Sequence, residues 1–221
     1  MTKHLRPSLL KHACIASMLI AYGGCFAATG VSQAKPTAGG KAESLEYPIT
    51  SDCKQQMANE KVMLLLAERY TNGMNATQSR YDVHGAEIER RFQQQGMSFL
   101  NREDLKKKMI QPEIDAHFVV DPSKAQRVVQ KQDATLTLRG LITSRRAFSP
   151  IRKTTETYVS LNLALVDVNG FYISEAVLNS ESSLGADTLG MVLDLIKQRG
   201  DDAVLKILSG YCAPRKQELK Q

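Results

Sequence analysis

The sequence predicts an α/β fold in which a mixed sheet, with a three-stranded antiparallel meander, is packed by helices in a single domain. The meander is indicated over residues 134–180, because residues 158–165 alternate between apolar and polar as in a half-buried strand. The apolar run at 62–67 is typical of a strand buried on both faces. Apolar residues at helical spacing over 189–196 indicate one of the covering helices.

The first strand is predicted at 61–68, followed by a loop at 70–73 and a helix over about 78–95. Gly96 suits the end of that helix, because glycine readily adopts the left-handed backbone conformation common at helix C-termini. The stretch 97–100 then predicts a second, short strand.

Two more helices are predicted before the meander. Asn101 can cap the first, because its side chain can accept hydrogen bonds from backbone N–H groups of the first turn. Pro112 limits that helix. Pro122 suits the first turn of the second helix, where its missing N–H is not needed.

The meander is expected to turn at Asn169 and Gly170. Both residues tolerate positive φ, so a tight two-residue hairpin is favoured. Leu136, Leu138 and Ile142 supply the strand before it. The turn sets the expected cross-strand pairs: Leu165 with Ser174, Leu163 with Ala176 and Leu161 with Leu178.

Two helices are predicted after the meander. Asp187 or Thr188 opens the first, and Gly200 ends it. Asp201 can cap the second, which runs through Leu208.

Residues 1–27 resemble a secretory signal peptide: a basic start is followed by a short apolar core at 13–21 and then by small residues. That core is too short for a membrane span. One processing route cleaves after Ala27. The other treats Cys25 as the lipidated first residue of a lipoprotein, although Tyr22 departs from the aliphatic residue usual there. Both routes predict a periplasmic protein, and the second anchors it to the outer membrane.

The rest of the chain is expected to contain a flexible linker at 28–50, a globular domain at 51–213 and a polar tail at 214–221. Either route leaves Cys53 and Cys212 in the domain, and an oxidising periplasm favours a disulfide between them. The alternative is two unrelated buried thiols.

Composition argues against several functions. Trp is absent and aromatic residues are 6% of the chain, which disfavours binding of nucleic acids by base stacking. His84 and His117, the histidines outside the leader, have no nearby nucleophile or metal-ligand pattern. We therefore predict no catalytic residue, no metal and no cofactor, and a protein that is not an enzyme.

One segment is a candidate for partner binding. Residues 143–154 are expected to form a loop between two strands, longer than a minimal hairpin. Arginines and an aromatic residue are common at protein interfaces, and the predicted contact residues are Arg145, Arg146, Phe148 and Arg152. The alternative is a solubilising hairpin tip.

The segments VMLLLAERYTNGMN, AEIERRFQQQGMSFLNREDLKKKM, QDATLTLRGLI and TYVSLNLALVDVNGFYISEAVLNSE, within residues 61–181, follow a recognisable order. This order resembles the globular domain of the LpoB-like lipoprotein activators of penicillin-binding proteins. It is also similar to the N-terminal domain of TolB, to flagellar T-ring proteins and to the curli secretion protein. The resemblance carries over no individual functional residue.

The resemblance implies a non-enzymatic periplasmic binding or assembly protein with a protein partner in the cell envelope. One such role is activation of a peptidoglycan synthase. However, a linker of about 25 residues spans about 90 Å only when fully extended and about 25–30 Å as a coil, which favours a component of a flagellar, curli or secretion machine near one membrane. An unrecognised periplasmic hydrolase is the alternative of another class. The sequence leaves the oligomeric state open.

Overall fold

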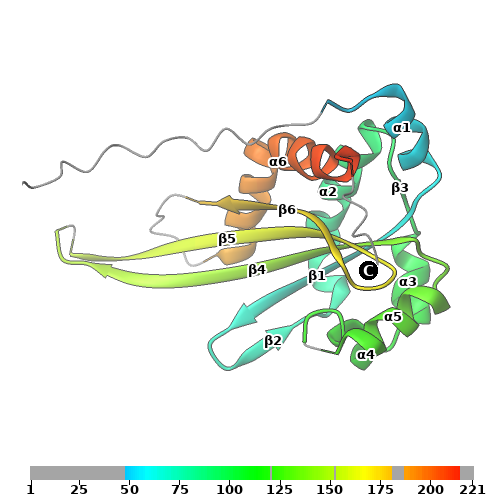
Figure 1. Cartoon of the computed structure of the whole chain (residues 1–221). Helices are drawn as coiled ribbons and strands as arrows, with labels where there is room; N and C mark the ends of the chain where they lie inside the picture. The colour runs from blue at the N-terminus through cyan, green and yellow to red at the C-terminus, as the bar shows by residue number, and fades with distance from the viewer. Residues whose placement is uncertain (1–47, 120, 152, 181–186, 215–221) are drawn as a thin grey trace, which may run out of the picture. The chain divides into compact units, whose positions relative to one another are not determined.

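A computed structural model describes residues 48–119, 121–151, 153–180 and 187–214, and it confirms the predicted fold class. A six-stranded mixed sheet has the order β2-β1-β4-β5-β6, with β3 paired to β1 (Figure 1). β1 runs parallel to β3 and β4, and the other pairs are antiparallel. The strands are β1 (Lys61–Tyr70), β2 (Gly73–Asn75), β3 (Ser98–Phe99), β4 (Leu136–Ser149), β5 (Thr154–Asp167) and β6 (Tyr172–Asn179).

Helices cover both faces of this sheet. They are α1 (Ser51–Ala58), the 3-10 turn η1 (Gln78–Tyr81), α2 (Asp82–Gln94), α3 (Arg102–Lys108), α4 (Gln111–Asp115), α5 (Pro122–Lys131) and α6 (Thr188–Cys212). α2 and α6 lie on one face, and α3, α4 and α5 lie on the other (Figure 1). None of the helices in the described segments has the length and apolar character to cross a membrane.

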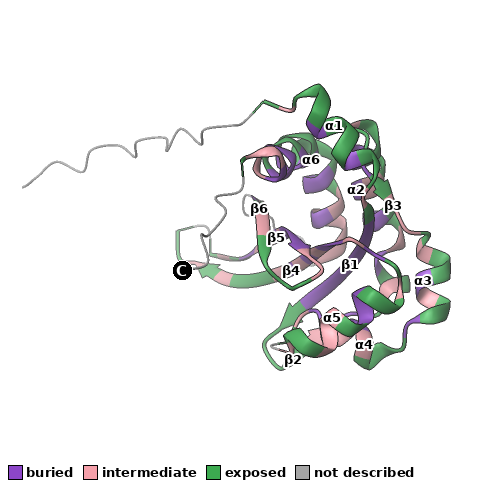
Figure 2. Cartoon of the chain, turned by 45° about the vertical axis from the view of Figure 1, so that its right-hand side comes forward, coloured by how far each residue is buried: buried purple, intermediate pink, exposed green. Residues whose placement is uncertain are grey.

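β1 divides its apolar run between two cores, as a strand covered on both faces should. Val62, Leu64 and Leu66 belong to one cluster, and Met63, Leu65 and Ala67 to the other. The strand is buried from Val62 to Glu68 (Figure 2). This confirms the interpretation of the uninterrupted run, because alternate side chains of a strand point to opposite faces.

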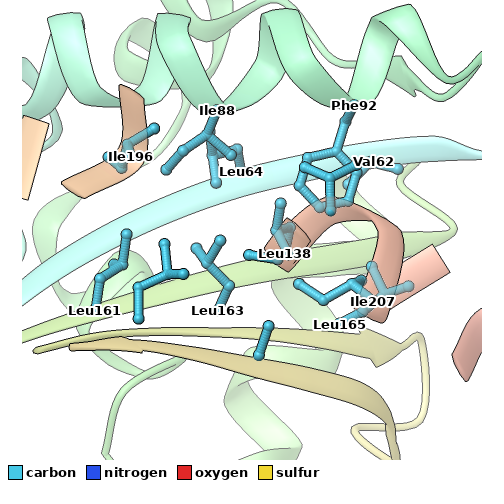
Figure 3. Packing of buried hydrophobic residues seen from close by; sticks show 14 of the residues in the cluster. Val62, Leu64, Ile88, Phe92, Leu138, Leu161, Leu163, Leu165, Ile196 and Ile207 are labelled. Atoms are coloured by element: carbon cyan, nitrogen blue, oxygen red, sulfur yellow. The ribbon is translucent and has the colours of Figure 1, made fainter. Parts of the chain in front are cut away.

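The larger core lies under α2 and α6. Ile88 and Phe92 point from α2 toward Leu64 and Val62 of β1, while Ile196 and Ile207 of α6 are buried in the same cluster (Figure 3). The apolar stripes of β4 and β5 complete the cluster with Leu138, Leu161, Leu163 and Leu165.

The register of the meander is as predicted, but its turn is not. Leu165, Leu163 and Leu161 pair with the expected residues of β6. The tight Asn169-Gly170 hairpin was wrong, because Gly170 has φ +86° whereas Asn169 is not in the positive-φ region. A bulge follows Leu165, and the Asp167 carboxylate accepts hydrogen bonds from the N–H groups of Asn169 and Phe171. These bonds favour a wider turn.

The C-terminal part was predicted as two helices and is one. α6 is continuous from Thr188 to Cys212, and the Asp187 side chain caps it by accepting from Gly190 N–H. Gly200 lies inside the helix and does not have the positive φ of a C-terminal glycine. A Cβ there would lie 2.8 Å from Arg91 Cδ on α2. The absence of a side chain at Gly200 therefore leaves room for Arg91 where α2 packs on α6.

Elsewhere the expected element boundaries shift by a few residues. The helix expected over 78–95 is η1 followed by α2, and Gly96 has φ +97° just after it. The Asn101 side chain accepts from the N–H groups of Glu103 and Asp104, as predicted. α1, α4 and β2 were not predicted, because each is short and carries little periodic signal.

Candidate functional site

The segment proposed for partner binding is a two-stranded ribbon rather than a loop. β4 continues to Ser149 and β5 begins at Thr154, and their residues pair throughout. The pairing of β4 with β1 stops at Thr143, and that of β5 with β6 stops at Ser160. We call residues 144–158 the β4–β5 ribbon; it extends beyond the helices in Figure 1. Among the described strands, its two strands pair only with each other.

The structure does not bring the predicted contact residues together on one face. Arg146 and Phe148 lie on the face that continues the larger core, opposite Thr157 and Thr155. Arg145 lies on the other face, opposite Tyr158. Arg152 is outside the described residues. The ribbon can therefore contact a partner with either face, and the predicted set divides between them.

Arg145 lies on the side of the sheet that α3, α4 and α5 cover, which we call the second face. Its guanidinium carbon lies 5.1 Å from the centre of the Tyr158 ring. The Tyr158 hydroxyl donates a hydrogen bond of 2.8 Å to Glu156. Stacking on an aromatic ring holds an arginine in place while leaving its N–H groups available at the edges. The role of Tyr158 was missed, since only the strand register reveals that it lies opposite Arg145.

The tip of the ribbon exposes large apolar side chains. Phe148 is 66% exposed and Ile151 is 93% exposed. The sequence of the ribbon has four basic residues and one acid, Glu156, whose side chain is buried. Phe148 and Ile151 thus stand within a basic surface.

The structure joins Cys53 and Cys212, the pair expected from the sequence. Their sulfurs are bonded, and the Cα atoms lie 5.7 Å apart across a sequence separation of 159 residues. The bond links α1 to the last residue of α6. Next to it, the Tyr211 hydroxyl donates 2.6 Å to Glu60. Cys25, the predicted lipidation residue, lies outside the described residues.

The histidines are more buried than expected. His84 Nε2 lies 2.8 Å from the carbonyl oxygen of Leu189, so this side chain links α2 to the start of α6. His117 is buried on the opposite face of the sheet, beside Arg139. In the described part of the chain, no three His, Cys, Asp or Glu residues are grouped to hold a metal ion.

Buried acids and phenols form structural contacts. Glu68 is buried, accepts from the Tyr70 hydroxyl and pairs with Arg80 at 3.3 Å. Burial, then the charge of Glu68, raises the pKa of nearby Tyr81 to about 12. The Tyr81 hydroxyl donates 2.8 Å to the Asn75 carbonyl. At neutral pH Tyr81 is a protonated hydrogen-bond donor within the core.

No protein-family model matches the chain, and no curated protein matches it. Solved structures that it is similar to include a hypothetical protein from Chlamydia trachomatis, at 15% identity over 70% of this chain and 99% of that chain, with a TM-score of 0.46. The C-terminal domain of LpoB from Salmonella enterica is 12% identical over 57% and 84%, with a TM-score of 0.36. The PelC dodecamer from Paraburkholderia phytofirmans is 12% identical over 67% and 87%, with a TM-score of 0.34. Similarities at these values assign neither a family nor a function.

Proposed function

We propose that this chain is a non-enzymatic periplasmic binding or assembly protein whose β4–β5 ribbon docks on an acidic surface of a partner in the cell envelope. The observation that carries the proposal is the ribbon itself. It reaches beyond the paired sheet with Phe148 and Ile151 exposed among basic residues. Exposed apolar side chains surrounded by arginine are typical of the centre of a protein interface.

The ribbon is suited to docking because its backbone is already ordered. The pairing of β4 with β5 continues to Ser149 and Thr154, so little backbone entropy remains to be lost on binding. Arg145 is held against Tyr158. Arginine N–H groups can form charge-assisted hydrogen bonds to partner carboxylates, and these bonds should make association sensitive to salt.

Activation of a peptidoglycan synthase is the specific role that we propose first, since the order of elements over 61–181 resembles the LpoB-like activators. A component of a flagellar, curli or secretion machine is the second candidate, which the short linker at 28–50 favours. The two roles differ in the partner that the ribbon would contact.

Site-specific photo-crosslinking in the native host tests where the partner binds. A photoreactive residue at position 151 is expected to capture one envelope protein. The same residue at Val83, which is 62% exposed on α2, is the matched control and should capture none. Equal capture at both positions, or capture at Val83 alone, would reject the ribbon as the docking surface.

A second test uses purified components. Replacing Arg145, Arg146, Phe148 and Arg152 with Ala should weaken binding to the host's peptidoglycan synthase at least tenfold, with a reduced dependence on salt. The control replaces Lys107, Lys108 and Ile110, which are exposed in and just after α3. It removes two positive charges and one large apolar side chain, whereas the test variant removes three charges and one such side chain. If the unaltered protein does not bind the synthase but captures a secretion or flagellar protein, the second role replaces the first.

A further inference from the structure

A cavity of about 260 Å³ lies on the second face of the sheet, between α5, the α4–α5 connection and the strands β4, β5 and β6. Its walls are mainly apolar and include Val119, Ala125, Val129 and Val166. Small-molecule sites combine such a lining with a few polar groups that orient the ligand. Among the residues that the structure describes, several of the polar side chains that line this cavity lack a hydrogen-bond or ion-pair partner.

Arg139 is the only Lys or Arg among the described residues that line this cavity. Its Nη1 donates 2.8 Å to the His117 carbonyl, and its guanidinium carbon lies 5.0 Å from the centre of the Tyr172 ring. No carboxylate within the described segments comes within ion-pair distance of it. The guanidinium is therefore fixed in position with donors and charge available for an anion.

Two buried groups lining the same cavity also lack partners. Thr137 Oγ1 and His117 Nε2 have no hydrogen-bond partner in the described structure. Leaving a buried polar atom unpaired is unfavourable. Burial, then the charge of Arg139, lowers the pKa of His117 to about 4, so the imidazole is neutral at pH 7. Arg139 thus supplies the positive charge alone.

Asp167 is the acid among the described lining residues. Its Oδ1 accepts hydrogen bonds from Asn169 N–H at 2.8 Å and Phe171 N–H at 2.9 Å. These bonds bind the carboxylate to the β5–β6 turn. Backbone donors also offset part of its negative charge.

From this geometry we infer that the cavity binds a small organic carboxylate, with its carboxylate on Arg139 and its apolar body against α5. The cavity size and apolar walls favour a short aliphatic chain over a bare inorganic anion. The carboxylate can belong to a free acid or to the C-terminus of a peptide, which share this chemistry. The described residues that line the cavity do not include any residue of the β4–β5 ribbon, so the site is independent of the proposed docking surface.

The experiment is an NMR titration of the full chain with hexanoate as the probe. It observes the Arg139 side-chain Nε–H signal and, in every variant, the backbone amide signals of the lining residues Thr137 and Tyr172. For a ligand of this size we expect a dissociation constant of about 1 mM. Hexanamide, which lacks the charge, should bind at least about tenfold more weakly, since hydrogen bonds to charged groups are the stronger ones. A short peptide with a free or amidated C-terminus then distinguishes the two sources.

Variants separate this site from general anion binding. Arg139→Gln should weaken hexanoate binding at least about tenfold. Arg199→Gln, the matched control, removes an arginine that also donates to a backbone carbonyl, that of Asn179, but lies outside the cavity, and it should leave hexanoate binding unchanged. Ala125→Phe keeps the arginine and fills the cavity, so it should abolish binding even if Arg139→Gln folds poorly. Unsaturable shifts, equal binding of hexanamide, or full binding by Ala125→Phe would each overturn the inference.

Discussion

The two faces of the sheet are built differently, although β1 contributes alternate residues of one apolar run to both. The face under α2 and α6 has an extensive apolar core, and the disulfide joins its covering helix α6 to α1. The face under α3, α4 and α5 has a smaller apolar cluster. It also contains the cavity, whose lining includes Thr137 Oγ1 and His117 Nε2, atoms without a partner in the part of the chain that the structure describes. On the first face such atoms, His84 Nδ1 and Arg91 Nε, lie where α2 packs against α6.

This difference indicates that the two faces of the sheet have different roles, one in stability and the other in binding. The face with the larger apolar core supplies most of the stability, because burial of apolar area is the main favourable term in folding. Unpaired polar groups reduce stability, and they are tolerated where another face supplies the surplus. On this view, the first face determines the fold and the second is available for binding.

Neighbouring leucines of β1 provide the strongest test. Leu64 faces the first core and Leu65 the second, and both are buried. We expect Leu64→Ala to lower the free energy of unfolding by about 4 kcal/mol and Leu65→Ala by about 3 kcal/mol, because the looser cluster can collapse into the space. Urea denaturation of both variants measures this. A larger loss for Leu65→Ala would contradict the comparison.

Removal of the disulfide tests whether the first face depends on its link. Replacing Cys53 and Cys212 together with Ser should lower the free energy of unfolding by about 3 kcal/mol. Thermal unfolding of the double variant, compared with the oxidised and reduced parent protein, measures the effect. Reduction of the parent protein should reproduce most of this loss of stability. If both thiols of the periplasmic protein are freely alkylated, the native protein lacks the bond.

Glu89 joins the two helical layers, since it projects from α2 to within 3.6 Å of Arg102 on α3. Burial raises the pKa of Glu89 to about 7, against the lowering effect of Arg102 and Lys106. The folded protein therefore holds the proton more tightly than the unfolded chain, so stability should fall as pH rises from about 4.5 to 7.

Glu89→Gln removes this titration. The free energy of unfolding of this variant should exceed that of the parent protein by on the order of 2 kcal/mol at pH 8, and the difference should vanish near pH 4. Denaturation curves at both pH values measure the difference. The same gain at both pH values would point to packing rather than to ionisation.

His117, on the second face, should have the opposite dependence. Its pKa in the folded protein is lowered to about 4 by burial and then by Arg139, below the ordinary value of 6.5. The unfolded chain takes up the proton first, so this contribution to stability is complete above pH 6.5 and is lost as pH falls toward 4.

His117→Gln should therefore flatten the stability profile at acidic pH. The parent protein is expected to lose about 1 kcal/mol through this group between pH 7 and pH 5.5. The imidazole signals of His117, followed by NMR, should show no protonation in that range. Protonation of His117 near pH 6.5 in the folded protein would rule out the effect.

The parts of the fold that were predictable carry a periodic apolar signal. The pairing of Leu161, Leu163 and Leu165 with β6 was predicted from the alternation and the position of the turn, and it holds because the bulge after Leu165 offsets the wider turn. The errors arose where a tertiary contact decided the outcome. Gly200 lies in mid-helix, where its lack of a side chain leaves room for Arg91 of α2, and Asp167 favours the wider turn by accepting from two backbone N–H groups.

The ribbon and the cavity also could not be predicted from the sequence, for related reasons. Residues 143–154 gave no alternating pattern, since none of the described side chains in this range is buried, and they were therefore interpreted as a loop. The cavity draws His117, Arg139 and Tyr172 from separate elements, and only the sheet order brings them together. Their types and spacing in the sequence contain no signal of that proximity.

The link between Cys53 and Cys212 also has a mechanical meaning. Every strand of the sheet lies between these residues in the chain. Tension applied between a residue before Cys53 and one after Cys212 passes through the sulfur–sulfur bond and largely bypasses the strands. The oxidised domain should thus act as a short, nearly inextensible link when pulled from its ends. After reduction, the same pull reaches the sheet and can unravel it.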